Sequence, residues 1–231
     1  PSGLAACKAA LEEGLVPLVL EQADGVGGLW RQDSYGKVWR SLRTNLSKFT
    51  CAFSDFPWPE EAADFPTGKD VQDYLDKYAS RFNLLEYINF ASRVMDIEPV
   101  SDGTEGWKVS WQQKGTNGIM TQQFKFLIVA TGIFEVAYKP NFPGEATFRG
   151  QIVHAATYRE PATFAGKKVL VVGSAFSGAD IAAEVSSVAS KVVISAQRSI
   201  WYLPRYIKSK PADLVFYSRA AAARSAAKSE E

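Results

Sequence analysis

The residues with the clearest chemical meaning form a turn of small residues at positions 173–178, read Gly-Ser-Ala-Phe-Ser-Gly. An apolar run precedes the turn at 169–172, and apolar residues recur after it at Ile181, Val185 and Val188, as on one face of a helix. A strand, a tight turn and a helix in this order leave the amide groups of the helix N-terminus open to an anion. The turn therefore predicts a pyrophosphate site, with contacts from Gly173, Ser174, Ser177 and Gly178.

The surrounding stretch predicts a βαβ unit. A second apolar run at 192–196 follows the helix, and residues 167–198 together have the size of one mononucleotide-binding half of a Rossmann fold. Continuous apolar runs are typical of strands that are buried on both faces. The turn departs from the dinucleotide pattern G-x-G-x-x-G because Ala175 replaces the middle glycine, so a plain packing turn stays open as an alternative.

A second candidate unit lies at the start of the chain. The pattern predicts a helix over 4–13 that stops at Gly14, and a strand over 16–20 that ends in Glu21. Gly3 would be the last glycine of a dinucleotide fingerprint, and Glu21, eighteen residues on, would be the acid that binds a ribose diol. The strand and glycines that should precede Gly3 are missing, so we expect a chain that is truncated here and also at its C-terminal end.

The two units differ at the position of this acid. Eighteen residues after Gly178 stands Ala196, at a place where an acid would bind a 2′-hydroxyl and repel a 2′-phosphate. Arg198 and Ser199 follow, and a planar cation with a hydroxyl suits a phosphate dianion better than a ribose diol. The pattern therefore predicts that the later unit prefers NADPH to NADH, with a merely solvated Arg198 as the alternative.

Composition limits the class of protein. The chain has 231 residues, 46% of them hydrophobic, and a net charge of +1, which predicts a globular protein without a nucleic-acid partner. No apolar run approaches the roughly 18–20 residues of a membrane span. Cys7 and Cys51 lack the spacing of a redox pair, and the single histidine, His154, cannot build a metal site alone, so we predict no metal. We expect a cytoplasmic protein, and a homo-oligomer stays open.

Glycines and aromatic residues dominate the stretch after Glu21. A loop of Gly27, Gly28, Leu29 and Trp30 lets the backbone approach a ligand closely, with a flexible surface turn as the alternative. Residues 35–66 predict a long irregular segment, and a segment this rich in Phe and Trp is not typical of disorder. We expect it to pack against a ligand.

A well-marked helix follows this segment. Thr67 and Asp70 have the spacing of a capping box, and the helix is expected to run to about Phe82. Its apolar residues recur at helical spacing and predict a core stripe. The stripe consists of Val71, Leu75, Tyr78 and Phe82.

Strands are predicted after the helix. Residues 88–123 show short alternating runs typical of a small β-meander, with Asn117-Gly118 as a hairpin turn. A continuous apolar run at 126–130 predicts another fully buried strand, which ends in Thr131-Gly132.

These motifs occur together in one known family. The pattern F-x-G-x-x-x-H-x-x-x-[YW] is matched in full by Phe148, Gly150, His154 and Tyr158. With two dinucleotide units beside it, the chain resembles the flavin-containing monooxygenases, in which a G-S-x-x-S-[AG] turn is a known variant. Further motifs that carry the resemblance are Gly27-Gly28-Leu29-Trp30, Ser41-Leu42, Thr44-Asn45, Ser54-Asp55-Phe56-Pro57 and Ala130-Thr131-Gly132.

The resemblance implies a fold and two cofactors. It implies an α/β chain of two Rossmann-type domains, 1–158 for FAD and 159–231 for NADPH, with the β-meander as an insertion. His154 is expected to orient the connection between the domains rather than to act as an acid or base. Besides the turn at 173–178, Arg198 and Ser199, the implied cofactor-binding residues are Gly3, Glu21, Gly27, Gly28, Leu29, Trp30, Thr44, Asn45, Thr131, Gly132, His154 and Tyr158.

The resemblance also implies a reaction. NADPH would reduce the flavin, O2 would add to give a C4a-hydroperoxide, and the distal oxygen would pass to a nitrogen or sulfur atom of a small molecule. Asn45 would lie beside the reactive face as the catalytic residue, with a turn residue that satisfies its own loop as the alternative.

Three other functions stay open. Baeyer–Villiger enzymes end the signature in Trp followed by Pro or Asp, whereas this chain has Tyr158 and Arg159, which favours the N- and S-oxidising branch. A flavin disulfide reductase shares the double dinucleotide unit but needs a cysteine pair that Cys7 and Cys51 do not form. A non-catalytic dinucleotide-binding module would be colourless and inert.

Overall fold

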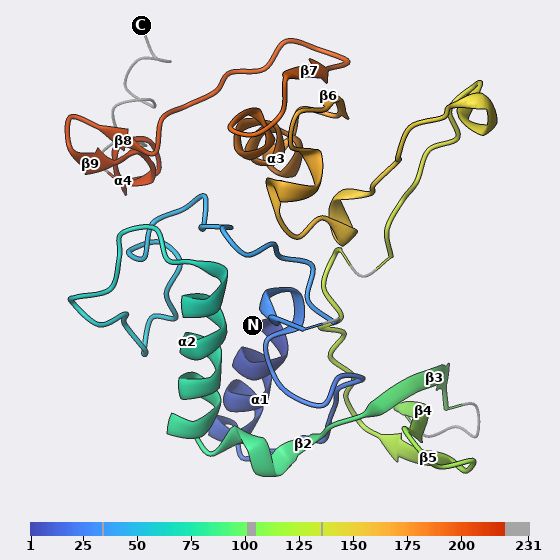
Figure 1. Ribbon diagram of the computed structural model, residues 1–231. Coiled ribbons are helices and arrows are strands. Elements are labelled where there is room, and N and C mark those ends of the chain that lie inside the picture. Colours follow the sequence, from blue (N-terminus) through green and yellow to red (C-terminus); the bar gives the residue numbers. More distant parts are fainter. Residues whose placement is uncertain (34, 101–104, 135, 220–231) are drawn as a thin grey trace, which may run out of the picture. The chain divides into compact units, whose positions relative to one another are not determined.

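The computed structural model describes residues 1–33, 35–100, 105–134 and 136–219, in which helices and strands combine as an α/β protein (Figure 1). The chain divides into two units, Pro1–Lys37 with Val71–Tyr138 and Val38–Asp70 with Lys139–Glu231. This division differs from the expected boundary after residue 158, because Trp39 and Tyr158 share one hydrophobic core with Ile181 and Val185, which lie beyond that boundary. The last part of the expected NADPH domain, residues 220–231, lies outside the described residues.

The first unit begins with helix α1, Ser2–Glu12, which confirms the helix predicted over 4–13. Gly14 follows with a φ of +73°, the left-handed conformation that commonly ends a helix. Strand β1, Val19–Leu20, then pairs in parallel with β2, Ile88–Asn89. Parallel pairing is the pattern of a Rossmann-type sheet, although β1 is shorter than the run that predicted it.

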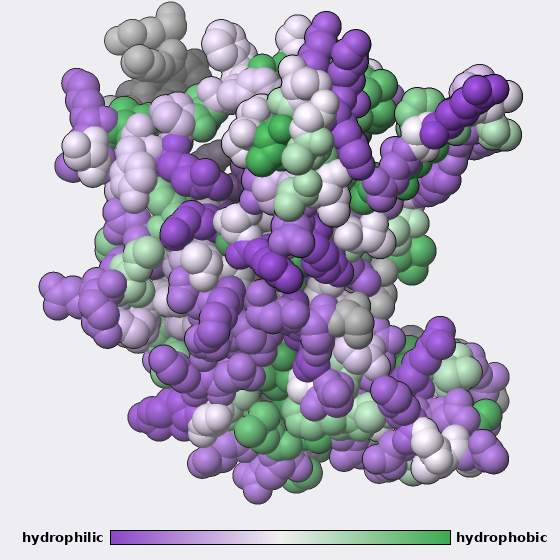
Figure 2. All heavy atoms as spheres, viewed as in Figure 1, coloured by the Kyte–Doolittle hydropathy of each residue, from purple (hydrophilic) through white to green (hydrophobic). Residues whose placement is uncertain are grey.

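Helix α2, Gly68–Arg81, begins with the predicted capping box. The Thr67 amide and hydroxyl donate to Asp70 Oδ2 at 2.8 and 2.7 Å, and the Asp70 amide donates back to Thr67 Oγ1 at 3.2 Å. Hydrophilic side chains cover the face of α2 that Figure 2 shows. Val71, Leu75 and Tyr78 of the predicted stripe are buried, as an amphipathic helix requires, whereas Phe82 follows the end of α2 and is only half-buried.

An antiparallel meander confirms the strands predicted between 88 and 123. It is ordered β3-β4-β5, with bounds Ser92–Pro99, Trp107–Gln113 and Ile119–Phe124. Asn117-Gly118 lies in the predicted hairpin connection between β4 and β5, but it does not form a two-residue turn by itself. The chain turns at Gly115, whose φ is +85°, and the Thr116 amide closes this turn on the Gln113 carbonyl oxygen at 3.1 Å. The meander therefore has a longer loop than the two-residue hairpin that an Asn-Gly pair favours.

The buried strand predicted over 126–130 is also wrong. Phe126, Ile128 and Val129 have exposed fractions of 59%, 64% and 69%, and no strand is assigned there. A strand needs a hydrogen-bonded neighbour, and no strand within the described ranges pairs with this segment. An apolar run alone therefore does not make a strand.

The second unit contains the predicted βαβ unit. Strands β6, Lys168–Val172, and β7, Lys191–Ser195, pair directly with each other in parallel. Helix α3, Phe176–Ser186, connects them along the chain, and Figure 1 shows the three elements together. α3 covers one face of the pair, where Ile181 and Val185 contact Val169 and Val192 in the same core as Trp39 and Tyr158.

The expectation that these strands are buried on both faces is wrong. Leu170 and Val172, which alternate with the core residues, are 62% and 56% exposed. Side chains of a strand point to opposite faces in turn, so α3 buries only every second residue. Within the described part of the chain, β6 and β7 form a sheet of two strands.

The rest of the second unit consists of short elements and loops. Residues 38–67 form turns, bends and isolated bridges, which confirms the predicted irregular segment. The short elements are η3 Glu145–Thr147, η4 Ala155–Thr157, η5 Pro161–Phe164, β8 Tyr206–Ile207, β9 Lys210–Pro211 and α4 Ala212–Phe216, and η2 Leu84–Tyr87 belongs to the first unit.

Candidate functional site

The N-termini of the three long helices differ in how they are capped. α2 is closed by its capping box, whereas α1 and α3 have no side-chain hydrogen bond from their N-cap residues, Pro1 and Ala175. Neither α1 nor α3 carries an acidic residue in its first turn. The terminal amides of α3 and the positive end of its dipole are therefore open to an anion such as a pyrophosphate. Within this sequence, no side chain of the N-cap residue closes the start of α1.

The turn between β6 and α3 depends on two glycines. Gly173 has a φ of +102°, which a residue with a side chain rarely adopts. A Cβ atom on Gly178 would lie 2.2 Å from the Gly173 carbonyl oxygen, so glycine is required for the helix to start this close to the strand. Ala175 has extended backbone angles, φ −71° and ψ −177°, that any residue adopts. Alanine in place of the middle glycine is therefore unstrained.

The carboxyl ends of β6 and β7 meet at this turn. The Gly173 amide donates to the Ser195 carbonyl oxygen at 2.9 Å, so the chain leaving β7 passes beside the turn. Ala196, Arg198 and Ser199 follow, and all three are exposed. The candidate 2′-phosphate residues thus leave the sheet at the edge that carries the candidate pyrophosphate residues Gly173, Ser174, Ser177 and Gly178.

In the first unit, the start of α1 lies near Glu21 and Ala130. Glu21 Oε1 accepts a hydrogen bond from the Ala23 amide at 2.8 Å. Glu21 interacts electrostatically with the backbone nitrogen of Pro1, which places the carboxylate near the start of α1. A Cβ atom on Gly3 would lie 3.8 Å from Ala130 Cβ. One region therefore holds the candidate FAD residues Gly3, Glu21, Thr131 and Gly132.

The glycine loop runs into the 3-10 helix η1, Gly28–Trp30. Gly27 and Gly28 have φ values of +123° and +55°, so the loop conformation itself requires glycine. Gln72 Nε2 donates to the Val26 carbonyl oxygen at 3.0 Å and ties the loop to α2. A Cβ atom on Gly28 would meet nothing within 4 Å, which leaves space for a ligand to approach the backbone.

Arg31 holds both ends of this loop, a role that motif reasoning missed. Its guanidinium is paired with the carboxylates of Asp24 and Asp33. The hydrogen bond from Arg31 to Asp33 raises the pKa of the arginine and lowers that of the aspartate, so both stay charged. The available signal was a cation flanked by two acids within one glycine loop.

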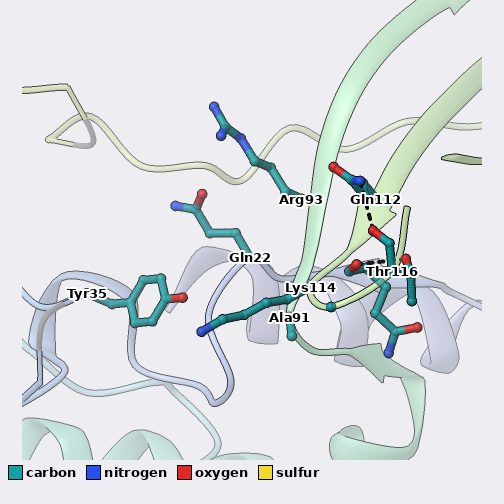
Figure 3. Close-up of a pocket in the computed structure, with 9 residues that line it drawn as sticks. Gln22, Tyr35, Ala91, Arg93, Gln112, Lys114 and Thr116 are labelled. Carbon is teal, nitrogen blue, oxygen red and sulfur yellow. Dashed lines mark hydrogen bonds between the residues drawn. The ribbon is translucent and has the colours of Figure 1, made fainter. Parts of the chain in front are cut away.

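A pocket of about 360 Å³ lies beside the residue that follows Glu21 (Figure 3). Arg93 and Lys114 contribute two cations, Gln22 lies between them in the view, and the Tyr35 hydroxyl faces the lysine. Among the described residues, no carboxylate lines the pocket, so its chemistry favours an anionic or polar ligand. No local motif in the sequence marks these residues, because they come from three segments far apart along the chain.

Asn45 belongs to the second unit and is exposed. The neighbouring Thr44 is only 5% exposed, and its amide donates to the Pro66 carbonyl oxygen at 2.9 Å. Thr44 Oγ1 is buried without a hydrogen-bond partner among the described residues, and such a group favours a polar ligand or water. Thr44 is thus buried and held by its backbone hydrogen bond, and the side chain of the next residue, Asn45, is exposed and available for binding.

The signature residues His154 and Tyr158 have structural contacts. His154 Nδ1 accepts from the Ala156 amide at 3.1 Å and caps η4, which agrees with a role in orienting the connection. Tyr158 is 3% exposed and donates to Glu184 Oε2 at 2.6 Å. Their assignment to cofactor binding stays a prediction.

The described ranges contain neither a metal site nor a helix that could span a membrane. No group of three or more His, Cys, Asp and Glu residues there could hold a metal ion. Cys7 and Cys51 are both free thiols. No helix in the same ranges is long and apolar enough to cross a membrane.

Comparison with known proteins links these features to one family. A family model described as flavin-binding monooxygenase-like matches residues 1–227. Flavin-containing monooxygenase 3 from Rattus norvegicus is 37% identical over 228 residues, which are 94% of this chain and 43% of that protein. Dimethylaniline monooxygenase [N-oxide-forming] 2 from Macaca mulatta is 35% identical, with 94% and 42% covered. The chain therefore spans less than half the length of these curated relatives.

Solved structures show the same fold. A flavin-containing monooxygenase from Stenotrophomonas maltophilia has a TM-score of 0.76 and 26% identity, with 95% of this chain and 63% of that chain covered. Cyclohexanone monooxygenase from Rhodococcus sp. Phi1, in a structure bound to NADP+, has a TM-score of 0.63 and 24% identity, with 83% and 35% covered. The second likeness concerns the fold alone.

Proposed function

The chain belongs to the flavin-binding monooxygenase-like family, and from this we propose that the full-length protein is an FAD- and NADPH-dependent monooxygenase of small molecules. The atom that it oxygenates is a nitrogen or sulfur. O2 is the second substrate.

The observation that carries this proposal is the contrast among the helix N-termini. The N-terminus of α3 is open and follows the dinucleotide pattern, and the first turn of α1 holds Gly3, the last glycine of the same pattern, while the third long helix is closed by its own side chains. A protein that binds two dinucleotides needs two such termini. Glu21 near α1 and Ala196 after β7 then distinguish a ribose diol from a ribose 2′-phosphate.

The residues of the first unit fit FAD. Gly3 at the start of α1 would receive the pyrophosphate, Glu21 the adenosine ribose, and the space at Gly28 the isoalloxazine end. Because Gln22 follows Glu21, the pocket of Figure 3 would receive the adenine end. FAD, when bound, supplies the oxygen chemistry that side chains lack.

The residues of the second unit fit NADPH. The open N-terminus of α3 would bind the pyrophosphate, and Arg198 with Ser199 would bind the 2′-phosphate. Asn45 would donate its side-chain amide at the reacting centre and stabilise negative charge there. The buried Thr44 hydroxyl beside it supplies a second polar contact.

Oxidation at nitrogen or sulfur is favoured over Baeyer–Villiger oxidation by one feature of the chain. Tyr158 is followed by Arg159, where Baeyer–Villiger enzymes have Trp followed by Pro or Asp. One relative is an N-oxide-forming dimethylaniline monooxygenase, which supports the same choice.

Purified full-length protein tests the proposal. It should be yellow, should consume NADPH only in the presence of O2, and should convert a tertiary amine or a thioether, but not a cyclic ketone, to an oxygenated product. A colourless protein that binds NADPH without oxidising it would instead be a dinucleotide-binding module.

A further inference from the structure

We propose that Asp213 is a positioning residue for Asn45, a role that rests on the proposed function. Asp213 lies in α4, 168 residues after Asn45, within the same unit. By binding the loop immediately after Asn45, it holds the backbone from which the catalytic amide is presented.

Three donors bind one carboxylate oxygen of Asp213. Asp213 Oδ2 accepts from the Ser47 amide at 2.9 Å, from Ser47 Oγ at 2.7 Å and from Thr50 Oγ1 at 2.5 Å. Asp213 is 4% exposed and Ser47 is completely buried. Hydrogen bonds that are shielded from water in this way hold a loop more firmly than exposed ones.

The carboxylate is charged, which strengthens these contacts. Burial acts to raise its pKa, but the hydrogen bonds from Thr50 and Ser47 outweigh burial and hold the pKa of Asp213 below its usual range. Hydrogen bonds to an ionised acceptor are roughly twice as strong as neutral ones.

Asn45 lies between two fixed points of the backbone. On one side, the Thr44 amide is bound to the Pro66 carbonyl oxygen at 2.9 Å, and on the other side Ser47 is bound to Asp213. Asn45 itself is exposed, so its amide can reach a ligand while its backbone stays in place. A catalytic group on a loop needs such support, because a shift of about 1 Å can cost a hundredfold in rate.

A second link between the same two segments provides a control. Tyr206 Oη donates to Asp64 Oδ2 at 3.3 Å, also joining the loop segment to the chain near α4, but at an exposed position. Tyr206→Phe removes that link and leaves Ser47 bound to Asp213. If any connection between the two segments were enough to position Asn45, loss of the Tyr206–Asp64 link would lower product per NADPH as much as loss of the Asp213–Ser47 link.

The experiment compares Asp213→Ala, Asp213→Asn, Tyr206→Phe and Asn45→Ala in the full-length protein. For each we measure oxygenated product and hydrogen peroxide formed per NADPH, KM for NADPH, and the thermal midpoint. Asp213→Ala should lower product per NADPH about tenfold or more, with little change in KM, and Asn45→Ala should behave in the same way. Asp213→Asn, which keeps an acceptor for Ser47, should recover part of the loss, and Tyr206→Phe should match wild type.

A lower thermal midpoint with unchanged product per NADPH in Asp213→Ala would overturn the positioning role and leave a structural one. If Asp213→Ala does not fold, Ser47→Ala removes one of the three hydrogen bonds and should shift the product ratio in the same direction, so an unchanged ratio there overturns the role too. Failure of the proposed function looks different, because wild type would then form no oxygenated product at all.

Discussion

The Tyr158 hydroxyl donates to Glu184 Oε2 at 2.6 Å, and Ser41 Oγ donates to the other oxygen of the same carboxylate. Tyr158 also packs edge-on against Trp39, with ring centroids 5.8 Å apart. One buried phenol thus joins the signature segment, the loop near residue 40 and helix α3. Because the Rossmann-type helix is anchored in this way, the signature tyrosine stabilises the unit that is predicted to bind NADPH.

Tyr158→Phe should reduce the free energy of unfolding by about 1.5–3 kcal/mol, the usual contribution of a hydrogen bond with a charged partner. The pH dependence identifies the contact. Burial and the hydrogen bond to Glu184 raise the pKa of Tyr158 above its ordinary value of 10.0. The unfolded chain therefore loses this proton first, and stability falls as the pH rises above about 10. Denaturant unfolding of wild type and Tyr158→Phe should be measured from pH 8 to 11. The free energy of unfolding should fall less over this range in Tyr158→Phe than in wild type.

Gly178→Ala should destabilise the second unit by about 1–3 kcal/mol, because its Cβ would lie 2.2 Å from the Gly173 carbonyl oxygen. Alanine in an unconstrained helix would instead stabilise it by roughly 1 kcal/mol. Gly118→Ala is the matched control, since a Cβ there meets nothing within 4 Å. Thermal unfolding and NADPH titration are the measurements. Equal behaviour of the two variants would contradict a requirement for close helix–strand packing.

Arg198→Ala should weaken the binding of NADPH by about ten- to a hundredfold and leave the binding of NADH nearly unchanged, as expected for one charge-assisted contact of roughly 1.5–3 kcal/mol. Lys191→Ala removes the same charge from the other end of β7 and serves as the control. Steady-state kinetics with both nicotinamides provides the test. Equal losses for the two cofactors in Arg198→Ala, or a wild type that prefers NADH, would show that this arginine does not bind the 2′-phosphate.

Asn45→Ala should keep flavin and NADPH oxidation but divert reducing equivalents to hydrogen peroxide, because the missing amide acts only at the reacting centre. Asn117→Ala, an exposed asparagine in the β4–β5 loop, should change nothing. Peroxide and product are quantified per NADPH consumed. If Asn45→Ala formed as much oxygenated product per NADPH as wild type, Asn45 would be a structural turn residue of its own loop and not a catalytic one.

Local patterns were enough to predict the elements and motifs. The capping box of α2, the stripe on its buried face, the βαβ unit and the small-residue turn all depend on residues a few positions apart, whose preferences act within one turn or one strand. The same patterns carried the resemblance to the family, which the comparisons then confirmed. They also predicted which unit carries an acid after its strand and which does not.

Only the tertiary structure decided which apolar runs are buried and which polar groups meet. The run at 126–130 and the alternate residues of β6 look like core in the sequence, yet they are exposed because no described strand or helix covers them. Asp213 and Ser47 stand 166 positions apart, and neither residue type nor spacing marks them as partners. Such contacts depend on how the whole chain folds back on itself, because burial and hydrogen bonding belong to pairs of distant segments.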